Sequence, residues 1–348
     1  MVELWFAILA ACVTAYVVLD GFDLGAGALH LVVARTDEER RQVLAAIGPF
    51  WDGNEVWLLV TGGVLFVAFP AVLAAGLSGF YFAIFLVLWC LVVRGIAIEF
   101  RSHVEDGLWR AAWDAAFSVA SGILALLFGV ALGNVVRGVP LSADGWFALS
   151  LFTDFRPHEP VGILDWYTVL VGLFALLALL THGAAYLSWK TEGAVGQRSR
   201  TIARRLGLGL LVLWPAVTGA TVRVRPTYFS AFASRPLAWL ALVTLAAGLI
   251  ALFAGLRRGR PLAAFLGSCA FLAGLLAATA VTMFPVLLPS TRDPSLSLTA
   301  LGSSTPVAGL RTALGWASIG FPLAVAYFFL LFRLHRGPAV AARGRDGY

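Results

Sequence analysis

The chain has 348 residues, of which 60% are hydrophobic and only 13% are charged. A water-soluble fold cannot bury so large an apolar share in one core, so the composition predicts an all-α membrane protein that crosses the bilayer many times. The net charge of +6 does not indicate a nucleic-acid partner, because the basic residues are scattered through short loops. The three cysteines lie far apart in apolar runs, which excludes a disulfide framework and a thiolate metal site.

Nine apolar stretches are long enough to cross a bilayer core, which is roughly 30 Å thick and needs about 20 helical residues. They lie near residues 4–33, 54–77, 78–100, 113–136, 163–189, 206–222, 236–256, 262–288 and 313–332. We therefore predict a single transmembrane domain over residues 1–336. The polar residues 337–348 are predicted to form a short, disordered cytoplasmic tail.

The basic residues of the loops predict the orientation. When the loops are assigned alternately to the two sides, 17 of the 25 Lys and Arg residues fall on one side and seven on the other, and Arg94 remains inside a span. Cytoplasmic loops carry the excess of Lys and Arg. The N-terminus is therefore predicted to lie outside and the C-terminus inside.

Six charged residues are predicted to form one layer toward the cytoplasmic ends of the first three helices: Asp20, Asp23, Asp52, Glu55, Arg94 and Glu99. Asp20 and Arg94 each lie about 24 Å from the outer ends of their helices. A charge at the centre of a spanning helix costs about 2.5–3.5 kcal/mol. We therefore expect these side chains to face the bundle interior or a hydrated cavity, where Arg94 pairs with one carboxylate and another relays protons.

Each part of this layer also has a structural interpretation. Asp52 can cap the second helix, with Glu55 as the reciprocal partner of a capping box. A pair between Arg94 and an aspartate can be purely structural. The segment that contains Glu99, Arg101, His103 and Glu105 lies at the water boundary and is interpreted as a solvated face.

Histidine and methionine positions bear on whether the chain could hold haem. A six-coordinate haem needs two axial ligands at matching depth, but His182 and Met283 are expected near opposite faces of the membrane. His182 is interpreted as a hydrogen-bonded core residue or as part of a proton path. The sequence contains no Walker A motif, dinucleotide-binding fingerprint or nucleophile elbow.

Seven sequence blocks resemble subunit II of the cytochrome bd quinol oxidases. They are LDGFDLGAG at 19–27, IGPFWDGNEVWL at 47–58, SGFY at 78–81, RGIAIEFRS at 94–102, GVALGN at 129–134, THGAAYL at 181–187 and MFPVLLPS at 283–290. The resemblance covers about residues 5–335 in the right order, and WDGNEVW is its most specific block.

The resemblance implies a nine-helix subunit, two four-helix bundles plus one peripheral helix, in a bacterial or archaeal cytoplasmic membrane. Its partner would be the homologous subunit I, which carries haem b and haem d-type groups, with a small single-helix accessory subunit as a further expected partner. The complex would oxidise quinol, reduce dioxygen to water and contribute to proton motive force. This chain would bind no haem and would not be catalytic alone, although a structural quinone or lipid is compatible with it.

Carried over by position, Asp52 would stand at the entrance of a proton path, with Asp20 and Asp23 near it. The position of Glu55 can be Gln in relatives, which argues against an essential proton role for this residue. Two alternatives remain open. The chain could be a structural scaffold for subunit I, or, from its intramembrane acids alone, an ion-coupled transporter.

Overall fold

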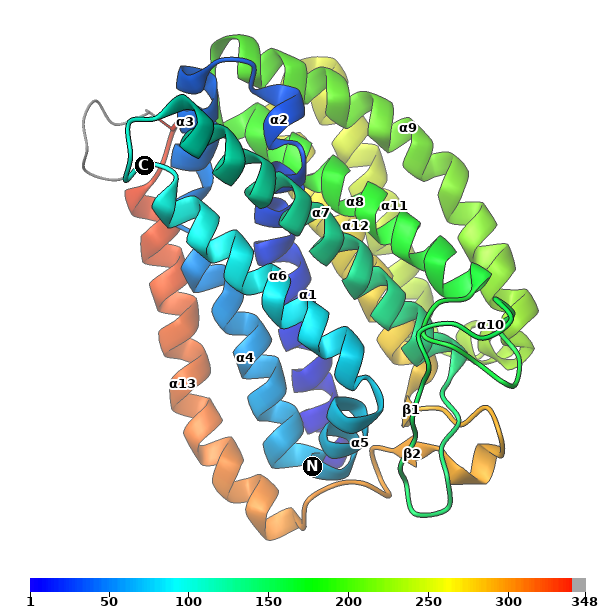
Figure 1. Cartoon of the computed structure of the whole chain (residues 1–348). Helices are drawn as coiled ribbons and strands as arrows, with labels where there is room; N and C mark the ends of the chain where they lie inside the picture. The colour runs from blue at the N-terminus through cyan, green and yellow to red at the C-terminus, as the bar shows by residue number, and fades with distance from the viewer. Residues whose placement is uncertain (340–348) are drawn as a thin grey trace.

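The computed structural model describes residues 1–339, which form a bundle of helices (Figure 1). In chain order the elements are α1 (Val2–Ala28), α2 (His30–Val33), α3 (Asp37–Ile47), α4 (Trp51–Ala68), α5 (Pro70–Gly79), α6 (Tyr81–Phe100), α7 (Gly107–Arg137), α8 (Trp166–Lys190), α9 (Gly193–Val224), α10 (Pro226–Ala233), α11 (Pro236–Arg258), α12 (Pro261–Met283), β1 (Val286–Leu288), the 3₁₀ turn η1 (Pro294–Leu296), β2 (Leu298–Thr299) and α13 (Val307–Leu334). Following the predicted orientation, we call the end of the bundle that holds residue 1 the outer end. The opposite end, with α2 and α3, is the inner end.

Eight helices in the described part of the chain are long and apolar enough to cross a membrane: α1, α6, α7, α8, α9, α11, α12 and α13. They correspond to eight of the nine predicted stretches. The number of crossings and the division into two bundles and a peripheral helix remain predictions.

The remaining stretch, 54–77, is the second in chain order, and its prediction as one continuous helix was wrong. It is broken at Phe69 into α4 and α5, and Pro70 is the first residue of α5. Proline has no backbone N–H to donate, and it disfavours helical dihedrals at the residue before it. Phe69 accordingly has φ −137° and ψ 57°, outside the helical region.

The helices of the inner end extend beyond the apolar stretches. The first inner loop contains α3, which starts with a capping box in which the Thr36 side chain accepts from the backbone of Glu39 and the Glu39 side chain accepts from the backbone of Thr36. The inner part of α9 begins at Gly193, well before the predicted start at residue 206. Hydropathy misses both segments because their exposed faces are charged.

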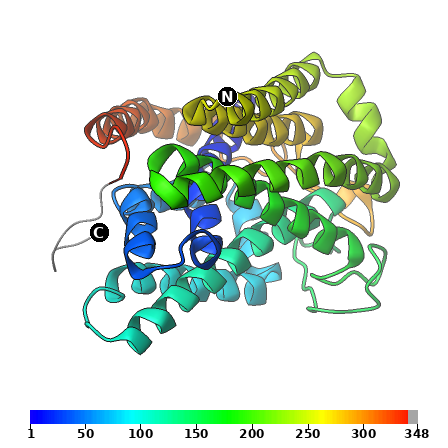
Figure 2. The same ribbon diagram turned by 90° about the horizontal axis from the view of Figure 1, so that it is seen from above.

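Helix α1 lies at the centre of the packing and contacts α4, α7, α8 and α12. Figure 2, a view from above, shows its blue ribbon with other helices around it. Its approach to α8 is close: a Cβ atom on Gly25 would lie 2.0 Å from the backbone oxygen of Leu179, and one on Gly183 would lie 2.3 Å from the backbone nitrogen of Ala26. Small residues at such positions let two helix backbones approach one another.

The outer end is closed by loops, by the short antiparallel pair β1 and β2, and by an isolated parallel bridge between Val139 and Ser290. The long segment between α7 and α8 is held at its base by an ion pair between Arg137 and Asp165, both buried. Asn134 adds a hydrogen bond from its side chain to the backbone oxygen of Ile163 at 2.9 Å. These contacts secure the predicted outer loop to the two helices that flank it.

The first residues of the predicted tail lie against the inner end of α8. The ammonium group of Lys190 donates to the backbone oxygen of His335 at 2.5 Å and to that of Gly337 at 3.0 Å. Residues 340–348, the larger part of that tail, lie outside the described range.

Candidate functional site

Two of the predicted charges meet inside the bundle. Arg94 of α6 donates two hydrogen bonds to Asp20 of α1, from Nη1 to Oδ2 at 3.0 Å and from Nη2 to Oδ1 at 2.6 Å. Both side chains are fully buried. The expected pairing of Arg94 with a carboxylate is therefore present, in the bidentate form that matches a guanidinium to a carboxylate.

Two further acids and an amide complete what we call the intramembrane cluster: Asp20, Asp23, Asn54, Glu55 and Arg94. Glu55 lies with Oε1 3.3 Å from Nη2 of Arg94. The Asn54 side chain donates to Oδ2 of Asp23 at 2.7 Å and to the backbone oxygen of Leu19 at 3.2 Å. Asn54 was not among the predicted site residues, although its place in the WDGNEVW block was visible in the sequence.

The intramembrane cluster has the composition of a site that exchanges protons. Three carboxyl groups surround one guanidinium, so the cluster can bind and release protons while Arg94 keeps a fixed positive charge among them. Buried polar atoms also remain without a hydrogen-bond partner among the described residues, namely Oδ1 of Asp23, Oδ1 of Asn54 and Nε of Arg94. Such atoms are typical binding positions for internal water.

Asp52 lies at the surface, in the first turn of α4. The predicted capping box is wrong, because α4 begins at Trp51, one residue before Asp52, and Phe50 occupies the cap without a side-chain hydrogen bond. Asp52 therefore does not cap the helix. Glu55 follows Asp52 by three residues, so the two side chains lie on the same side of α4. The side chain of Glu55 is 26% exposed, so its burial is intermediate between that of the exposed Asp52 and that of the fully buried Arg94.

The two remaining predicted residues lie outside the cluster. Glu99 is exposed in the last turn of α6. His182 of α8 is buried, with Nε2 2.9 Å from the backbone oxygen of Val18 and Nδ1 2.7 Å from the hydroxyl of Ser268. Because a carbonyl oxygen only accepts, Nε2 donates to Val18, while Nδ1 contacts the Ser268 hydroxyl, which also lies 2.6 Å from the backbone oxygen of Phe265. Both nitrogens are engaged within the core.

The two histidines buried within the bundle make hydrogen bonds to other described residues. The two ring nitrogens of His182 are used in hydrogen bonds, and Nε2 of His30 is bound to Asp114. No group of three or more His, Cys, Asp or Glu side chains within residues 1–339 is arranged to hold a metal ion.

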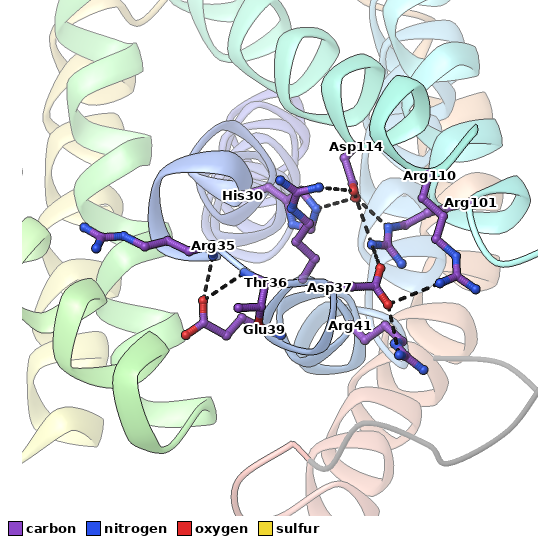
Figure 3. A network of polar contacts seen from close by, with 10 residues as sticks. His30, Arg35, Thr36, Asp37, Glu39, Arg41, Arg101, Arg110 and Asp114 are labelled. Atoms are coloured by element: carbon purple, nitrogen blue, oxygen red, sulfur yellow. Dashed lines mark hydrogen bonds and ion pairs between the residues drawn. The ribbon is translucent and has the colours of Figure 1, made fainter. Parts of the chain in front are cut away.

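A second polar network lies at the inner end and was missed in the sequence (Figure 3). Asp114 of α7 accepts from Nε2 of His30 at 2.7 Å, from Nε of Arg101 at 2.5 Å and from Nη1 of Arg40 at 3.0 Å. Arg101 also donates to Asp37 of α3 at 2.7 Å. We call these five residues the inner network. It joins the segment 30–40, which holds α2 and α3, to the segment 101–114, more than 60 residues further along the chain.

The interpretation of Arg101 as part of a solvated face is wrong. Its relative exposure is 1%, because α3 folds back over the ends of α6 and α7. The one available signal was Asp114, an acid at the start of an otherwise apolar predicted span. A buried arginine of this kind requires carboxylate partners, and Asp114 and Asp37 supply them.

The pKa values of the inner network follow from burial and charge. Burial lowers the pKa of His30 below its ordinary 6.5, although the hydrogen bond to Asp114 acts in the opposite direction. For Asp37, partial burial favours the neutral acid, but the hydrogen bond from Arg101 and the charges of Arg110 and Arg41 prevail and lower its pKa. His30 is therefore neutral at pH 7, and Asp37 is ionised.

Replacing Asp37 with Asn is expected to loosen α3. Asp37 is 37% exposed, so the loss should be modest, about 1 kcal/mol or less of local stability. Since folding lowers the pKa of Asp37, the stabilisation is present at neutral pH and is lost as the pH falls below about 3.8. Hydrogen–deuterium exchange of α3 measures both effects. Equal protection of α3 in the variant and the parent at pH 7 would show that the pair with Arg101 does not hold this helix.

Comparison with known proteins gives the family and a similar fold. The family model described as "Cytochrome bd terminal oxidase subunit II" matches residues 1–335. The probable cytochrome oxidase subunit 2 of Haemophilus influenzae is 32% identical over 351 residues, which cover 93% of this chain and 91% of that protein. The cytochrome bd-I ubiquinol oxidase subunit 2 of Escherichia coli K12 is also 32% identical, over 353 residues and with the same coverage.

The fold is similar to a solved structure, the bd oxidase from Geobacillus thermodenitrificans, with a TM-score of 0.73. The two chains are 18% identical, and the superposition covers 96% of this chain and 98% of the other. The family model spans nearly the whole chain. The two relatives are each 32% identical to this chain over 93% of its length. This chain therefore belongs to the cytochrome bd terminal oxidase subunit II family.

Proposed function

We propose that this chain is the haem-free subunit II of a quinol-oxidising cytochrome bd complex and that it supplies cytoplasmic protons for dioxygen reduction. Its relative in Escherichia coli is named as a subunit of a ubiquinol oxidase, which supports the reaction class. In this family the haems belong to subunit I, where they would supply electron transfer and dioxygen chemistry. The complex would reside in the cytoplasmic membrane, and an accessory subunit remains a prediction from the resemblance.

The observation that supports the proton role is the series of acids that leads from the exposed Asp52 through Glu55 to the buried Asp20 of α1. Asp52 is exposed at the inner end of α4, and Glu55 lies about 4.5 Å further along the same helix. Glu55 and Asp20 then share the guanidinium of Arg94, at 3.3 and 2.6 Å. Arg94 would hold the two carboxyl groups close enough for a proton to pass between them, directly or through water.

The acids of this series have different roles in the proposal. Asp52 would collect protons at the cytoplasmic surface, and Asp20 would receive them beside Arg94. Asp23, one turn further along α1, has an unpartnered Oδ1 and would act as the next acceptor. Glu55 would assist rather than be essential, because relatives can carry Gln at this position.

A purely structural role is the second candidate, and the bidentate geometry of Arg94 on Asp20 favours it. A buried ion pair of this kind can fix two helices relative to one another without exchanging protons. The chain would then act as a scaffold for subunit I. The ion-coupled transporter considered from the sequence is not favoured by membership of an oxidase family.

A structural quinone or lipid would have room in an apolar cavity of about 340 Å³ between α1 and the helices α7 to α12. Its wall is almost entirely hydrocarbon, with a few hydroxyl groups, among them Tyr16, Tyr167 and Thr221. Apolar cavities with a small number of polar groups are typical ligand sites. We propose that this cavity holds the structural quinone or lipid.

Replacing Asp52 with Asn is expected to slow quinol oxidation by the assembled complex at least about tenfold, because a positioned proton-transfer group typically contributes about 10²–10⁴-fold to a rate. Haem content should stay unchanged, because Asp52 is exposed and does not cap α4. The measurement is dioxygen consumption per haem with a soluble quinol in detergent.

The matched control is Glu38→Gln, which removes an exposed acid of the inner end on α3. This variant should keep the parental rate. If Asp52→Asn also turned over at the parental rate with unaltered proton uptake, Asp52 would not be the proton entrance.

A further inference from the structure

Five arginines lie together at the inner end, where α9 passes the turn between α11 and α12. We call them the basic patch, and all of them are exposed: Arg200, Arg204, Arg257, Arg258 and Arg260. Arg200 donates from Nε to the backbone oxygen of Leu256 at 2.9 Å, so α9 is joined directly to the end of α11. Arg204 follows one turn later on the same side of α9. The basic patch is therefore built from two segments that are distant in the sequence.

No carboxylate of the described chain neutralises the basic patch. The sequence has no Asp or Glu between Gly193 and Arg292, and the five arginines form no ion pair within residues 1–339. Elsewhere at the inner end, Asp37 and Asp114 pair with four arginines, namely Arg40, Arg41, Arg101 and Arg110. The general excess of arginine on the cytoplasmic side explains how many of these residues there are, but it does not explain the unequal pairing. The basic patch thus keeps its positive charge for an anion from outside the chain.

The helix ends beside the basic patch favour an anion as well. The C-terminus of α11 carries partial negative charge, but the side chain of Arg200 covers it. Helix α12 begins at Pro261, and Arg260 at its N-cap makes no side-chain hydrogen bond to the helix. The first N–H groups of a helix have no intrahelical partner, so the N-terminus of α12 adds partial positive charge to that of the arginines.

Exposed apolar side chains follow the basic patch on both helices. On α9, Leu208 comes one turn after Arg204, toward the outer end, and is more than half exposed. On α11, Ile250 is also more than half exposed and precedes Arg257 by two turns, so the two residues share one side of that helix. Each helix therefore presents positive charge at the inner end and hydrocarbon next to it.

The distance between the charged and the apolar side chains suits a lipid. The step from Arg204 to Leu208 is about 6 Å along α9. The headgroup region on each side of a bilayer is roughly 5–8 Å thick. Helices α9 and α11 are still in contact at this level, since a Cβ atom on Gly207 would lie 3.1 Å from Cζ of Phe253. When the arginines lie at the level of the headgroups, this contact between the helices lies beside the acyl chains.

We propose that the basic patch binds the phosphate headgroup of an anionic phospholipid of the inner leaflet, whose acyl chains lie along the contact between α9 and α11. Clusters of about four to eight basic residues just cytoplasmic of a spanning helix are typical of such binding. A soluble anion or an acidic protein segment would use the arginines but not the apolar side chains next to them. The lipid is distinct from the molecule proposed for the apolar cavity, whose lining contains no arginine. The proposal does not depend on the proton role of this subunit.

The test measures lipid retention by the whole complex, purified in detergent and washed free of loosely bound phospholipid. The washed complex is titrated with phosphatidylglycerol, which is anionic, and separately with phosphatidylcholine, which has no net charge. Native mass spectrometry counts the lipid molecules that stay bound. We expect the parent to retain a phosphatidylglycerol molecule at concentrations at which phosphatidylcholine is not retained. Added salt should weaken this binding, because it screens the attraction between the charges.

Arg204→Gln combined with Arg257→Gln removes one charge of the basic patch from each of the two helices. Both side chains are exposed and have no ion pair within residues 1–339, so the variant should assemble with its normal haem content. One arginine near the membrane surface contributes about fivefold to the affinity, so the affinity for phosphatidylglycerol should fall about 25-fold. Arg200 is left in place because it holds the end of α11.

Arg333→Gln combined with Arg336→Gln is the matched control. It removes the same charge from two exposed arginines at the inner end of α13, which lies far from α9 (Figure 1). This variant should bind phosphatidylglycerol as tightly as the parent does. If the control lost as much affinity as the basic-patch variant, the effect would be one of total charge and the site would be rejected.

Three further outcomes decide whether a lipid is the ligand. Equal binding of phosphatidylglycerol by the basic-patch variant and the parent would overturn the proposal, and so would equal retention of the two lipids by the parent. Inorganic phosphate in excess should not displace the phosphatidylglycerol, because it lacks the acyl chains. Displacement by phosphate would show that the basic patch is a site for a soluble anion and not for a lipid.

Discussion

Replacing Arg94 with Leu is expected to cause the largest loss of any single change in this subunit. Arg94 is the one cation of the intramembrane cluster, and its removal leaves Asp20, Asp23 and Glu55 without a counter-charge. Breaking a buried ion pair by removing one partner costs about 3–5 kcal/mol. The yield of complex that carries haem should therefore fall about tenfold or more, as measured by haem absorption per unit of membrane protein.

A second substitution separates the structural role of this pair from proton transfer. In the double variant Arg94→Leu, Asp20→Asn, a neutral amide replaces the carboxylate that pairs with Arg94 in the parent. No charge of this pair is then left buried alone, so the yield of complex should partly recover. If the pair relays protons, the recovered complex should still turn over slowly. If the subunit is only a scaffold, its turnover per haem should return to the parental value, and the proposed proton role of Asp20 would be wrong.

Replacing Gly25 with Ala is expected to cause the second large loss. The added methyl carbon would lie 2.0 Å from the backbone oxygen of Leu179 and 2.9 Å from Cα of Gly183, so no flexible side chain can move aside for it. Helices α1 and α8 would have to separate, and overpacking of this kind costs about 1–3 kcal/mol. We expect a lower melting temperature of the complex and, because α1 carries Asp20 and Asp23, a lower turnover.

The matched control for this prediction is Gly219→Ala on α9. A Cβ atom on Gly219 would have nothing within 4 Å, and this glycine is exposed. The variant should therefore keep the parental melting temperature or exceed it slightly, because Ala favours helix over Gly. Equal melting temperatures for Gly25→Ala and the parent would show that α1 and α8 are less closely packed than the structure indicates.

The depth of the charged layer could be predicted from the sequence because it depends on one dimension only. A helix rises about 1.5 Å per residue whatever surrounds it, so Asp20 and Arg94 were expected at one level before any contact was known. Their bidentate hydrogen bonds bear out that expectation. The predicted stretches 113–136 and 163–189 also leave out the non-helical segment between α7 and α8, whose polar backbone could not be exposed to lipid.

The partners of these charges could not be predicted in the same way. Hydropathy does not record how far each helix is rotated about its axis, and this rotation decides that Asn54 faces Asp23 while Glu99 faces outward. The inner network was missed for a related reason. Arg101 is buried only because α3, a charged helix within a predicted loop, folds over it.

The sequence by itself determined that this protein is a helical membrane protein, where its charges lie in depth and which family it resembles. These properties follow from the length and order of apolar residues, which act locally along the chain. The tertiary structure decided which acid holds Arg94, which acid lies at the surface and which buried polar atoms lack a hydrogen-bond partner. Those properties depend on helix rotation and on distances between helix axes, and close contacts such as that of Gly25 with α8 set these distances.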